Sequence, residues 1–261
     1  MVIMEQDFYK DLDELIAMLK KNEKYAFVRF GDGEGCILLD AGWVNHAGWV
    51  NRKRNSSTWK HSRGNYEDEK FRLELMKSIR FSDKNYFVGL HRNDGNSNRW
   101  NWIEGELTKM TTVPKEQLTF ATIFSKHNWH NSLNNFMPEA TSRESYLVCN
   151  EYGELGDRSS FFKKIFPVPK VNAHLEWEDT YLKVKKYIET NEITDATFLF
   201  AAGPSSAPII HNLWKTNKEN FFIDIGSILD RHLFKHAKNK GRSRGFLKKG
   251  IKGYKKCKWE C

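Results

Sequence analysis

The sequence predicts an α/β fold: one mostly parallel sheet flanked by helices in a single domain. In the second half of the chain, segments with helical spacing of apolar residues alternate with short runs rich in β-branched and aromatic residues. Helices that connect successive strands favour parallel pairing. A length of 261 residues with 39% hydrophobic residues suits one globular domain with a sizeable core.

The first half opens with a helix and a strand. Apolar residues spaced by three and four predict a helix over 7–20. A strand over 25–30 then ends in a glycine-rich turn at 31–35, where a second helix starts. The sequence next predicts a polar loop at 42–66, a charged helix with a solvated face at 66–80, a strand at 85–90, a loop at 91–96, and strands at 117–124 and 145–150.

The second half predicts two further helix–strand units. A helix over 177–190 precedes the most apolar strand, 196–202. That strand leads into a Gly-Pro-Ser-Ser turn and a helix that reaches about residue 215. The last strand is expected at 220–225. In parallel sheets of this kind, ligands bind beyond the carboxyl ends of the strands.

The positive charge of the chain lies at its C-terminus. The net charge is +9, and residues 235–261 hold eleven of the 42 Lys and Arg but only one of the 33 acids, Glu260. That segment therefore carries +10, and residues 1–234 carry −1. We expect a folded domain over 1–234 and a basic tail over 235–261, with the tail in contact with an acidic surface.

The four cysteines and the N-terminus favour a cytoplasmic location, with possible membrane association through the tail. Cys36, Cys149, Cys257 and Cys261 form no CxxC pair, and low cysteine usage fits a reducing compartment. The N-terminus is acidic and lacks the apolar segment of a signal peptide. Basic residues interspersed with apolar ones in the tail suit the surface of an anionic membrane.

A motif with two carboxylates follows the first predicted strand. Residues 29–34 read RFGDGE, so Asp32 and Glu34 are two positions apart and could share one hard cation, Mg²⁺ or Mn²⁺. Arg29 could pair with a carboxylate or a phosphate. Gly31 and Gly33 allow a sharp turn. An ordinary surface turn is the alternative, because Asp-Gly is common in turns.

A second motif follows the strand at 196–202. Residues 201–208 read AAGPSSAP and lead into a helix, whose unpaired N–H groups and partial positive charge attract phosphate. Ser205 and Ser206 would donate hydroxyl groups to such a ligand. A plain capped helix is the alternative interpretation.

A third motif ends the last predicted strand. Residues 222–227 read FIDIGS, and Asp230 lies three residues beyond. Asp224 and Asp230 could complete a metal or nucleotide site. An aspartate that caps the following helix fits the same sequence.

Together the three motifs resemble those of the GT-D-fold glycosyltransferases. Residues 27–34 resemble the Asp-x-Glu motif of that family, residues 201–206 its Gly-Pro-Ser turn, and residues 223–226 its late Asp-Ile-Gly strand. The resemblance implies a Rossmann-like fold, a UDP-sugar donor and a divalent cation, often Mn²⁺. Ser227 stands where members of the family often carry His, and Asp230 is the nearest acid.

The expected activity is transfer of a hexose or pentose from a nucleotide diphosphate sugar to a glycan or lipid-linked hydroxyl acceptor in glycan biosynthesis. An inverting enzyme would also need a general base near the acceptor hydroxyl. We expect nucleotide-sugar binding by Arg29, Gly31, Gly33, Gly203, Pro204, Ser205, Ser206 and Asp224, metal binding by Asp32, Glu34 and Asp230, and catalysis by Asp32, His91 and Asp94.

Two other functions use the same features. A nucleic-acid-binding module could use the basic tail, but the body is nearly neutral and carries no nucleic-acid motif, so no specific nucleic-acid partner is expected. A nucleotide-hydrolysing or phosphoryl-transfer enzyme could use the same carboxylates. The sequence argues against the P-loop form of such an enzyme, because no GK[ST] follows the first glycines.

Overall fold

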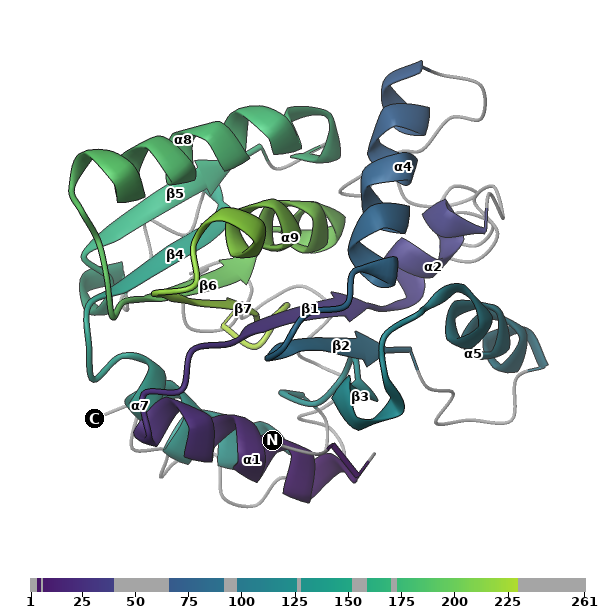
Figure 1. The fold of residues 1–261 in the computed structure, drawn as a ribbon, viewed down its shortest axis with the longest axis horizontal. Coiled ribbons are helices and arrows are strands. Elements are labelled where there is room, and N and C mark those ends of the chain that lie inside the picture. The colour runs from purple at the N-terminus through teal and green to yellow at the C-terminus, as the bar shows by residue number, and fades with distance from the viewer. Residues whose placement is uncertain are drawn as a thin grey trace, which may run out of the picture.

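A seven-stranded parallel sheet forms the centre of the computed structural model (Figure 1). The structure describes residues 4–5, 7–39, 66–91, 98–125, 128–151, 159–169 and 173–229. The strand order is β3-β2-β1-β7-β6-β4-β5. The strands are β1 (Ala26–Phe30), β2 (Tyr86–Leu90), β3 (Leu118–Phe120), β4 (Ser145–Asn150), β5 (Lys164–Val168), β6 (Thr197–Ala201) and β7 (Phe221–Asp224). The predicted α/β, Rossmann-like class is confirmed.

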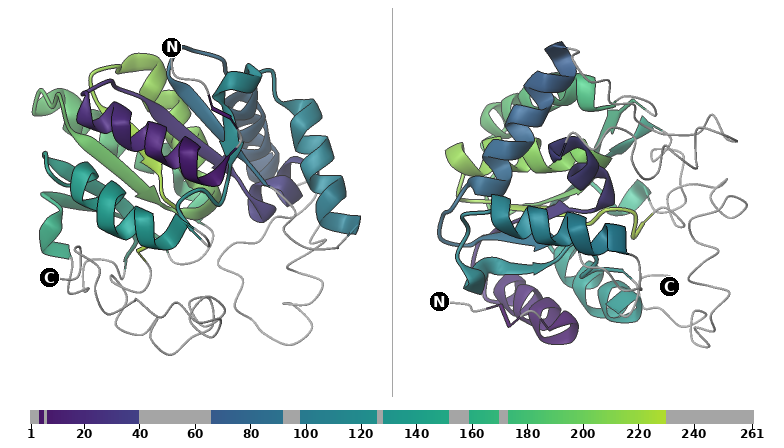
Figure 2. Two further views of the ribbon diagram at one scale, coloured as in Figure 1. Left: turned by 90° about the horizontal axis from the view of Figure 1, so that it is seen from below. Right: turned by 90° about the vertical axis from the view of Figure 1, so that its right-hand side faces the viewer.

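Helices cover both faces of the sheet (Figures 1 and 2). One face packs against α2 (Asp32–Leu38), α4 (Tyr66–Arg80), α5 (Asn98–Met110), α8 (Trp177–Thr190) and α9 (Ser206–Thr216). The other packs against α1 (Phe8–Lys20), α6 (Trp129–Asn131), the π-helical turn η3 (Ser132–Phe136) and α7 (Met137–Ala140), which lie side by side in Figure 2. Short 3-10 turns are η1 (Lys115–Gln117), η5 (Ser159–Phe161), η6 (Ala173–Glu176) and η7 (Gly203–Ser205).

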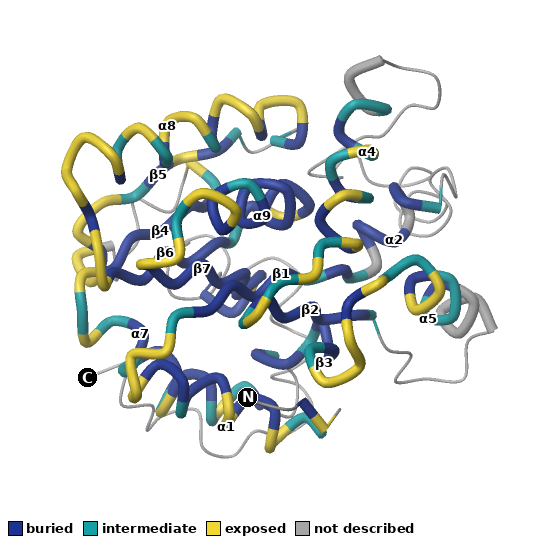
Figure 3. The backbone as a smooth tube through the Cα atoms, viewed as in Figure 1, coloured by how far each residue is buried: buried dark blue, intermediate teal, exposed yellow. Residues whose placement is uncertain are grey.

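Alternation of side chains along the strands divides the core between the two faces. In β1, Ala26, Val28 and Phe30 join the cluster under α9, whereas Phe27 joins the cluster over α1. The central strands are buried on both faces, and exposed residues lie on the outer sides of the helices (Figure 3). Strands covered on both faces are typical of parallel sheets.

Some elements were not predicted from the sequence, and one strand differs from its predicted bounds. Strand β5 and the helices α5 to α7 were not predicted. The strand expected over 117–124 is shorter, because β3 ends at Phe120 and residues 121–125 form turns. Helix α4 has the predicted solvated face, and its other side buries Phe71, Leu75 and Ile79. No helix among the described residues is long and apolar enough to cross a membrane. The predicted loop 42–66 and the tail 235–261 lie outside the described residues.

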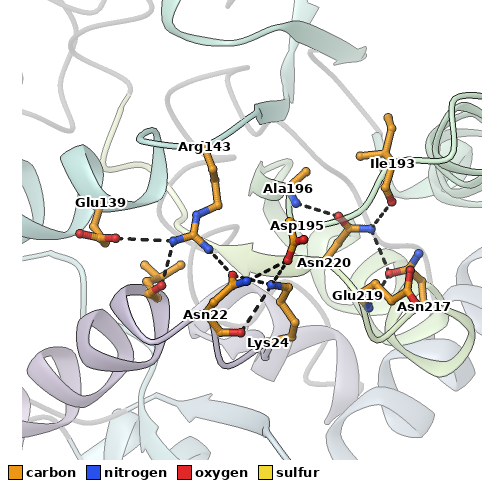
Figure 4. A network of polar contacts seen from close by, with 11 residues as sticks. Asn22, Lys24, Glu139, Arg143, Ile193, Asp195, Ala196, Asn217, Glu219 and Asn220 are labelled. Atoms are coloured by element: carbon orange, nitrogen blue, oxygen red, sulfur yellow. Dashed lines mark hydrogen bonds and ion pairs between the residues drawn. The ribbon is translucent and has the colours of Figure 1, made fainter.

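A polar network holds the edge of the sheet at which the strands begin, the amino edge (Figure 4). Buried Asn220 accepts the N–H of Ala196 at 2.9 Å and donates to the carbonyl of Ile193 at 2.8 Å. Arg143 donates to the carbonyl of Leu19 and to the side-chain oxygen of Asn22, both at 2.8 Å. The Asn220 contacts join the starts of β6 and β7 to the segment after α8, and the Arg143 contacts join the segment before β4 to the end of α1. The opposite, carboxyl edge carries the predicted motifs.

Candidate functional site

The three motifs lie at the carboxyl edge on three adjacent strands. Strand β7 lies between β1 and β6, with Phe27 paired to Ile223 and Leu199 paired to Ile223 on the other side. The turns after these strands therefore open at one edge, beyond the right-hand ends of the arrows in Figure 1. Sequence reasoning placed each motif at a strand end, and the topology makes the three strands neighbours.

Arg29 and Asp224 form an ion pair across two of these strands. The Nε of Arg29 lies 3.1 Å from Oδ1 of Asp224, and the two side chains are 21% and 3% exposed. The Nη1 of Arg29 also donates to the carbonyl of Ala121, beyond β3, at 2.8 Å. Two of the guanidinium nitrogens are thus engaged inside the protein.

Gly226 forms a left-handed turn beneath this ion pair. Its φ is +56°, a region that favours glycine. Its N–H donates to Oδ1 of Asp224 at 2.9 Å. A Cβ at this position would lie 2.1 Å from Nη2 of Arg29, so the guanidinium lies directly against the glycine. Any larger residue would displace Arg29.

Burial raises the pKa of the Asp224 carboxyl above its ordinary value, because the protein interior disfavours its charged form. The positive charge of Arg29 and the N–H of Gly226 act in the opposite direction and lower that pKa. These partners are what makes a charged carboxylate tolerable in this position. The acid at the end of β7 therefore caps its own turn and balances Arg29. The sequence indicated that Arg29 could pair with a carboxylate, but not that this carboxylate is Asp224.

The first motif opens a helix. Helix α2 begins at Asp32, directly after the strand residue Phe30 and the N-cap Gly31. The Gly31 N–H donates to Oε2 of Glu34 at 2.9 Å, which is one half of a capping box; Gly31 has no side chain to supply the other half. Glu34 is 9% exposed. Its carboxylate thus lies against the first turn of α2, at the carboxyl edge.

The second motif leads into α9 through a 3-10 turn. Gly203 has a left-handed φ of +61°, and no atom of the described residues lies within 4 Å of where its Cβ would be. Ser206 accepts the N–H of Ala202 at 3.2 Å. Ser205 is 1% exposed, and its hydroxyl has no hydrogen-bond partner among the described residues. Neither serine caps α9 through its side chain, so the plain capping interpretation does not account for them.

The remaining predicted residues are partly outside the described chain. His91 follows β2 at the same edge and is partly buried. Asp94, Asp230 and the side chain of Asp32 lie outside what the structure describes. Within the described ranges, no three His, Cys, Asp or Glu residues form a group that could hold a metal.

Those ranges supply one candidate carboxylate for a cation at the first motif, Glu34. Carboxylate oxygens are the ligands that hard cations such as Mg²⁺ and Mn²⁺ prefer. The oxygen-donor chemistry therefore fits Mg²⁺ or Mn²⁺, with further ligands required from outside the described residues.

Two features of this site were not predicted. The carbonyl of Ala121 accepts from Arg29 in the turn after β3, a strand that does not adjoin β1. Gly226 had no assigned role, although an Asp-x-Gly sequence at a strand end is a signal for a side chain that accepts the N–H two residues later. The pairing with Ala121 has no signal in the sequence.

The chain matches no protein-family model and no curated protein sequence. It does resemble solved structures. A new glycosyltransferase (DUF1792) from Streptococcus sanguinis has a TM-score of 0.59 and 15% identity over 85% of this chain and 80% of its own. A selenomethionine structure of domain of unknown function 1792 has a TM-score of 0.55 and 18% identity over 83% and 77%.

A third structure, described as domain of unknown function 1792 with a distinct glycosyltransferase fold, has a TM-score of 0.52 and 16% identity over 83% of this chain and 77% of its own. These similarities span most of each chain. At such low identity they establish the fold. The fold implied by the motif resemblance is thereby confirmed.

Proposed function

We propose that the chain is a glycosyltransferase that uses a nucleotide diphosphate sugar, linked to UDP. The observation that carries the proposal is the convergence of three motif-bearing turns on the adjacent strands β1, β7 and β6. They meet at the edge where doubly wound sheets bind nucleotides. The similar fold of a protein described as a glycosyltransferase supports it.

The diphosphate would bind at the start of α9. Residues Gly203, Pro204, Ser205 and Ser206 form this start, and open space lies beside Gly203. Backbone N–H groups and the helix dipole favour an anion there. The buried, unpartnered hydroxyl of Ser205 is a further donor. Gly31 and Gly33 would line the donor from the side of β1.

Asp32, Glu34 and Asp230 would hold a divalent cation, Mn²⁺ or Mg²⁺. Such a cation supplies charge neutralisation at the leaving diphosphate. Glu34 is already fixed at the first turn of α2 by the hydrogen bond from Gly31. This orientation keeps its carboxylate at the carboxyl edge without a further ordering cost.

Candidates for the general base follow two of the strands in the sequence. His91 and Asp94 follow β2, and Asp230 follows β7. Asp32, a further catalytic candidate, opens the helix after β1. A base near the acceptor hydroxyl would take its proton as the hydroxyl attacks the anomeric carbon. The acceptor would be a glycan or a lipid-linked hydroxyl, and the transferred sugar a hexose or pentose.

The basic tail would recruit the enzyme to an anionic membrane. Each Lys or Arg near such a surface contributes about 1 kcal/mol, and residues 235–261 hold eleven. Deletion of 241–261 should abolish sedimentation with phosphatidylserine vesicles and leave transfer to a soluble acceptor unchanged. Failure of the full-length chain to bind these vesicles at low salt would contradict membrane recruitment alone.

A thermal-shift panel of nucleotides and nucleotide sugars, with and without Mn²⁺, tests the enzymatic proposal. A ligand at about one hundred times its Kd adds about 2.7 kcal/mol to the free energy of unfolding. UDP and UDP-sugars should raise Tm more than ADP or NAD, and transfer assays should release UDP only with an acceptor. A shift with adenine nucleotides and hydrolysis without sugar transfer would indicate a nucleotide hydrolase instead.

A further inference from the structure

One side chain, Arg29, connects three strand ends at the carboxyl edge. It extends from β1, pairs with Asp224 at the end of β7, and donates to the carbonyl of Ala121 beyond β3. Strand β2 lies between β1 and β3, so these contacts span four neighbouring strands. The described structure shows the third motif fastened to the first through this residue.

These contacts hold the guanidinium inside the protein. Asp224 is almost fully buried, and loss of its partner would leave a buried charge uncompensated. Arg29 therefore cannot turn toward a ligand phosphate without breaking the ion pair. A side chain that binds phosphate is expected to be more exposed than Arg29 and to have fewer contacts with protein groups.

The guanidinium also fixes the turn after β7. It lies where a Cβ of residue 226 would be, and Asp224 accepts the N–H of Gly226. Before the turn, the Ile225 N–H donates to the carbonyl of Phe200 at 2.9 Å. After it, Ile228 and Leu229 are buried in the core beside α1. The turn is thus held on both sides.

Ser227 is the exposed residue of this turn. Between Gly226 and Leu229 it alone is exposed, and its neighbours on both sides are buried. A hydroxyl held at the carboxyl edge next to β1 and β6 is suited to donate a hydrogen bond to an oxygen-rich ligand. Its position depends on the backbone at Gly226, and that backbone depends on Arg29.

We infer that Arg29 is a positioning residue that fixes the turn at Gly226 and thereby directs the Ser227 hydroxyl toward the nucleotide sugar. The contact of Ser227 with the donor rests on the proposed function. Arg29 and Asp224 then act through the turn and do not touch the ligand. This assignment differs from the expectation that both bind the nucleotide directly.

The first test needs no ligand. Hydrogen–deuterium exchange of backbone amides 225–229 is measured in the full-length protein for Arg29→Lys, Gly226→Ala and wild type. Lysine keeps the charge but cannot reach Asp224 and Ala121 together. Both variants should exchange faster over this segment. Arg143→Lys, a matched change at the amino edge, should not alter it. Unchanged exchange in both turn variants would overturn the inference.

The second test is a double-mutant cycle on UDP affinity with Arg29→Lys and Ser227→Ala. We expect a loss of about tenfold for Arg29→Lys, and no further loss when Ser227→Ala is added, because the hydroxyl is already displaced. Additive losses would make Arg29 a direct ligand. If wild-type protein binds no uridine nucleotide, the proposed function fails, and the exchange experiment still decides whether Arg29 holds the turn.

Discussion

Gly203 and Gly226 share a left-handed backbone, with φ of +61° and +56°, but in the described part of the chain only Gly226 lies beneath another side chain. A Cβ at 226 would meet the guanidinium of Arg29 at 2.1 Å, and a Cβ at 203 would meet no described atom within 4 Å. The two glycines therefore separate the cost of the backbone conformation from the cost of displacing Arg29.

Alanine at each position should measure these costs. Gly203→Ala should lower the free energy of unfolding by about 1–2 kcal/mol, the penalty for a left-handed residue with a Cβ. Gly226→Ala should cost a further 1–3 kcal/mol or so, because overpacking adds to that penalty. Urea denaturation of both variants checks the difference. Equal losses would mean that Arg29 moves aside without cost.

Ser205→Ala should affect stability and binding in opposite directions. The Ser205 hydroxyl is buried without a partner among the described residues, so its removal should leave the stability of the free protein unchanged or raise it by up to about 1 kcal/mol. UDP affinity should fall by roughly three- to tenfold, the value of one neutral hydrogen bond. Calorimetric titration and denaturation check both. Unaltered affinity would remove Ser205 from the donor site.

Glu34→Gln should preserve the helix start and impair the reaction. Glutamine keeps an oxygen that accepts the Gly31 N–H, but it loses the charge that a cation needs. Tm should change little, and turnover should fall by about a hundredfold or more. Asp32→Asn should lower turnover to a similar extent. The control Asp195→Asn, at the amino edge, should leave turnover unchanged. Normal turnover in Glu34→Gln would exclude Glu34 as a metal ligand.

Asn220→Leu should destabilise the fold without a change at the carboxyl edge. It would leave the buried Ala196 N–H and Ile193 carbonyl without their partner (Figure 4). Unsatisfied buried groups cost about 1–3 kcal/mol each, so a loss of about 2–5 kcal/mol is expected on denaturation. Leucine at exposed Asn191, whose side chain donates among the described residues only to the carbonyl of Tyr187, should cost far less. UDP affinity of the folded variant should remain at the wild-type value.

His211 should make stability depend on pH. Burial of this α9 side chain, whose ring contacts Phe81, lowers the pKa of the imidazole from 6.5 to about 4, with Lys215 and Lys77 acting in the same direction and Glu74 against it. Between these pH values the unfolded chain binds a proton that the folded chain does not. The stability that this neutral, buried imidazole contributes to the fold is therefore complete above pH 6.5 and is lost as the pH falls toward 4.

The size of this effect is at most about 1.4 kcal/mol per pH unit. Denaturation of His211→Leu at pH 7 and pH 5 should therefore show a smaller loss on acidification than wild type. Asn191→Leu, which removes no titratable group, should keep the wild-type slope. An unchanged slope in His211→Leu would assign the acid sensitivity to other groups.

Periodicity and strand composition predicted most of the fold. The central strands are apolar runs bounded by turns, which is why six of the seven were found. Strand β5 escaped because it contains Pro167 and alternates exposed with buried residues at the sheet edge. Strand β3 is short because the chain turns immediately after Phe120, and β-branched residues beyond it gave no sign of that turn.

For the site, the sequence supplied the residues but not their partners. Glu34 bonds three residues back, a local pattern that helix-capping rules could have detected. Arg29 and Asp224 were both singled out, yet their mutual pairing depends on β1 and β7 being neighbours. That adjacency is a property of the topology and has no local signal. The sequence alone does not distinguish an arginine that binds a ligand from an arginine that pairs with an aspartate.

The central position of β7 also constrains how the chain can fold during synthesis. Ala26 pairs with Phe222, so nearly the whole described sequence must leave the ribosome before the middle of the sheet can close. Until then β1 and β6 each present an unpaired, apolar edge to which other chains can add. A nascent chain arrested before residue 221 should therefore require a chaperone, and premature termination there should yield aggregates and no partly active fragment.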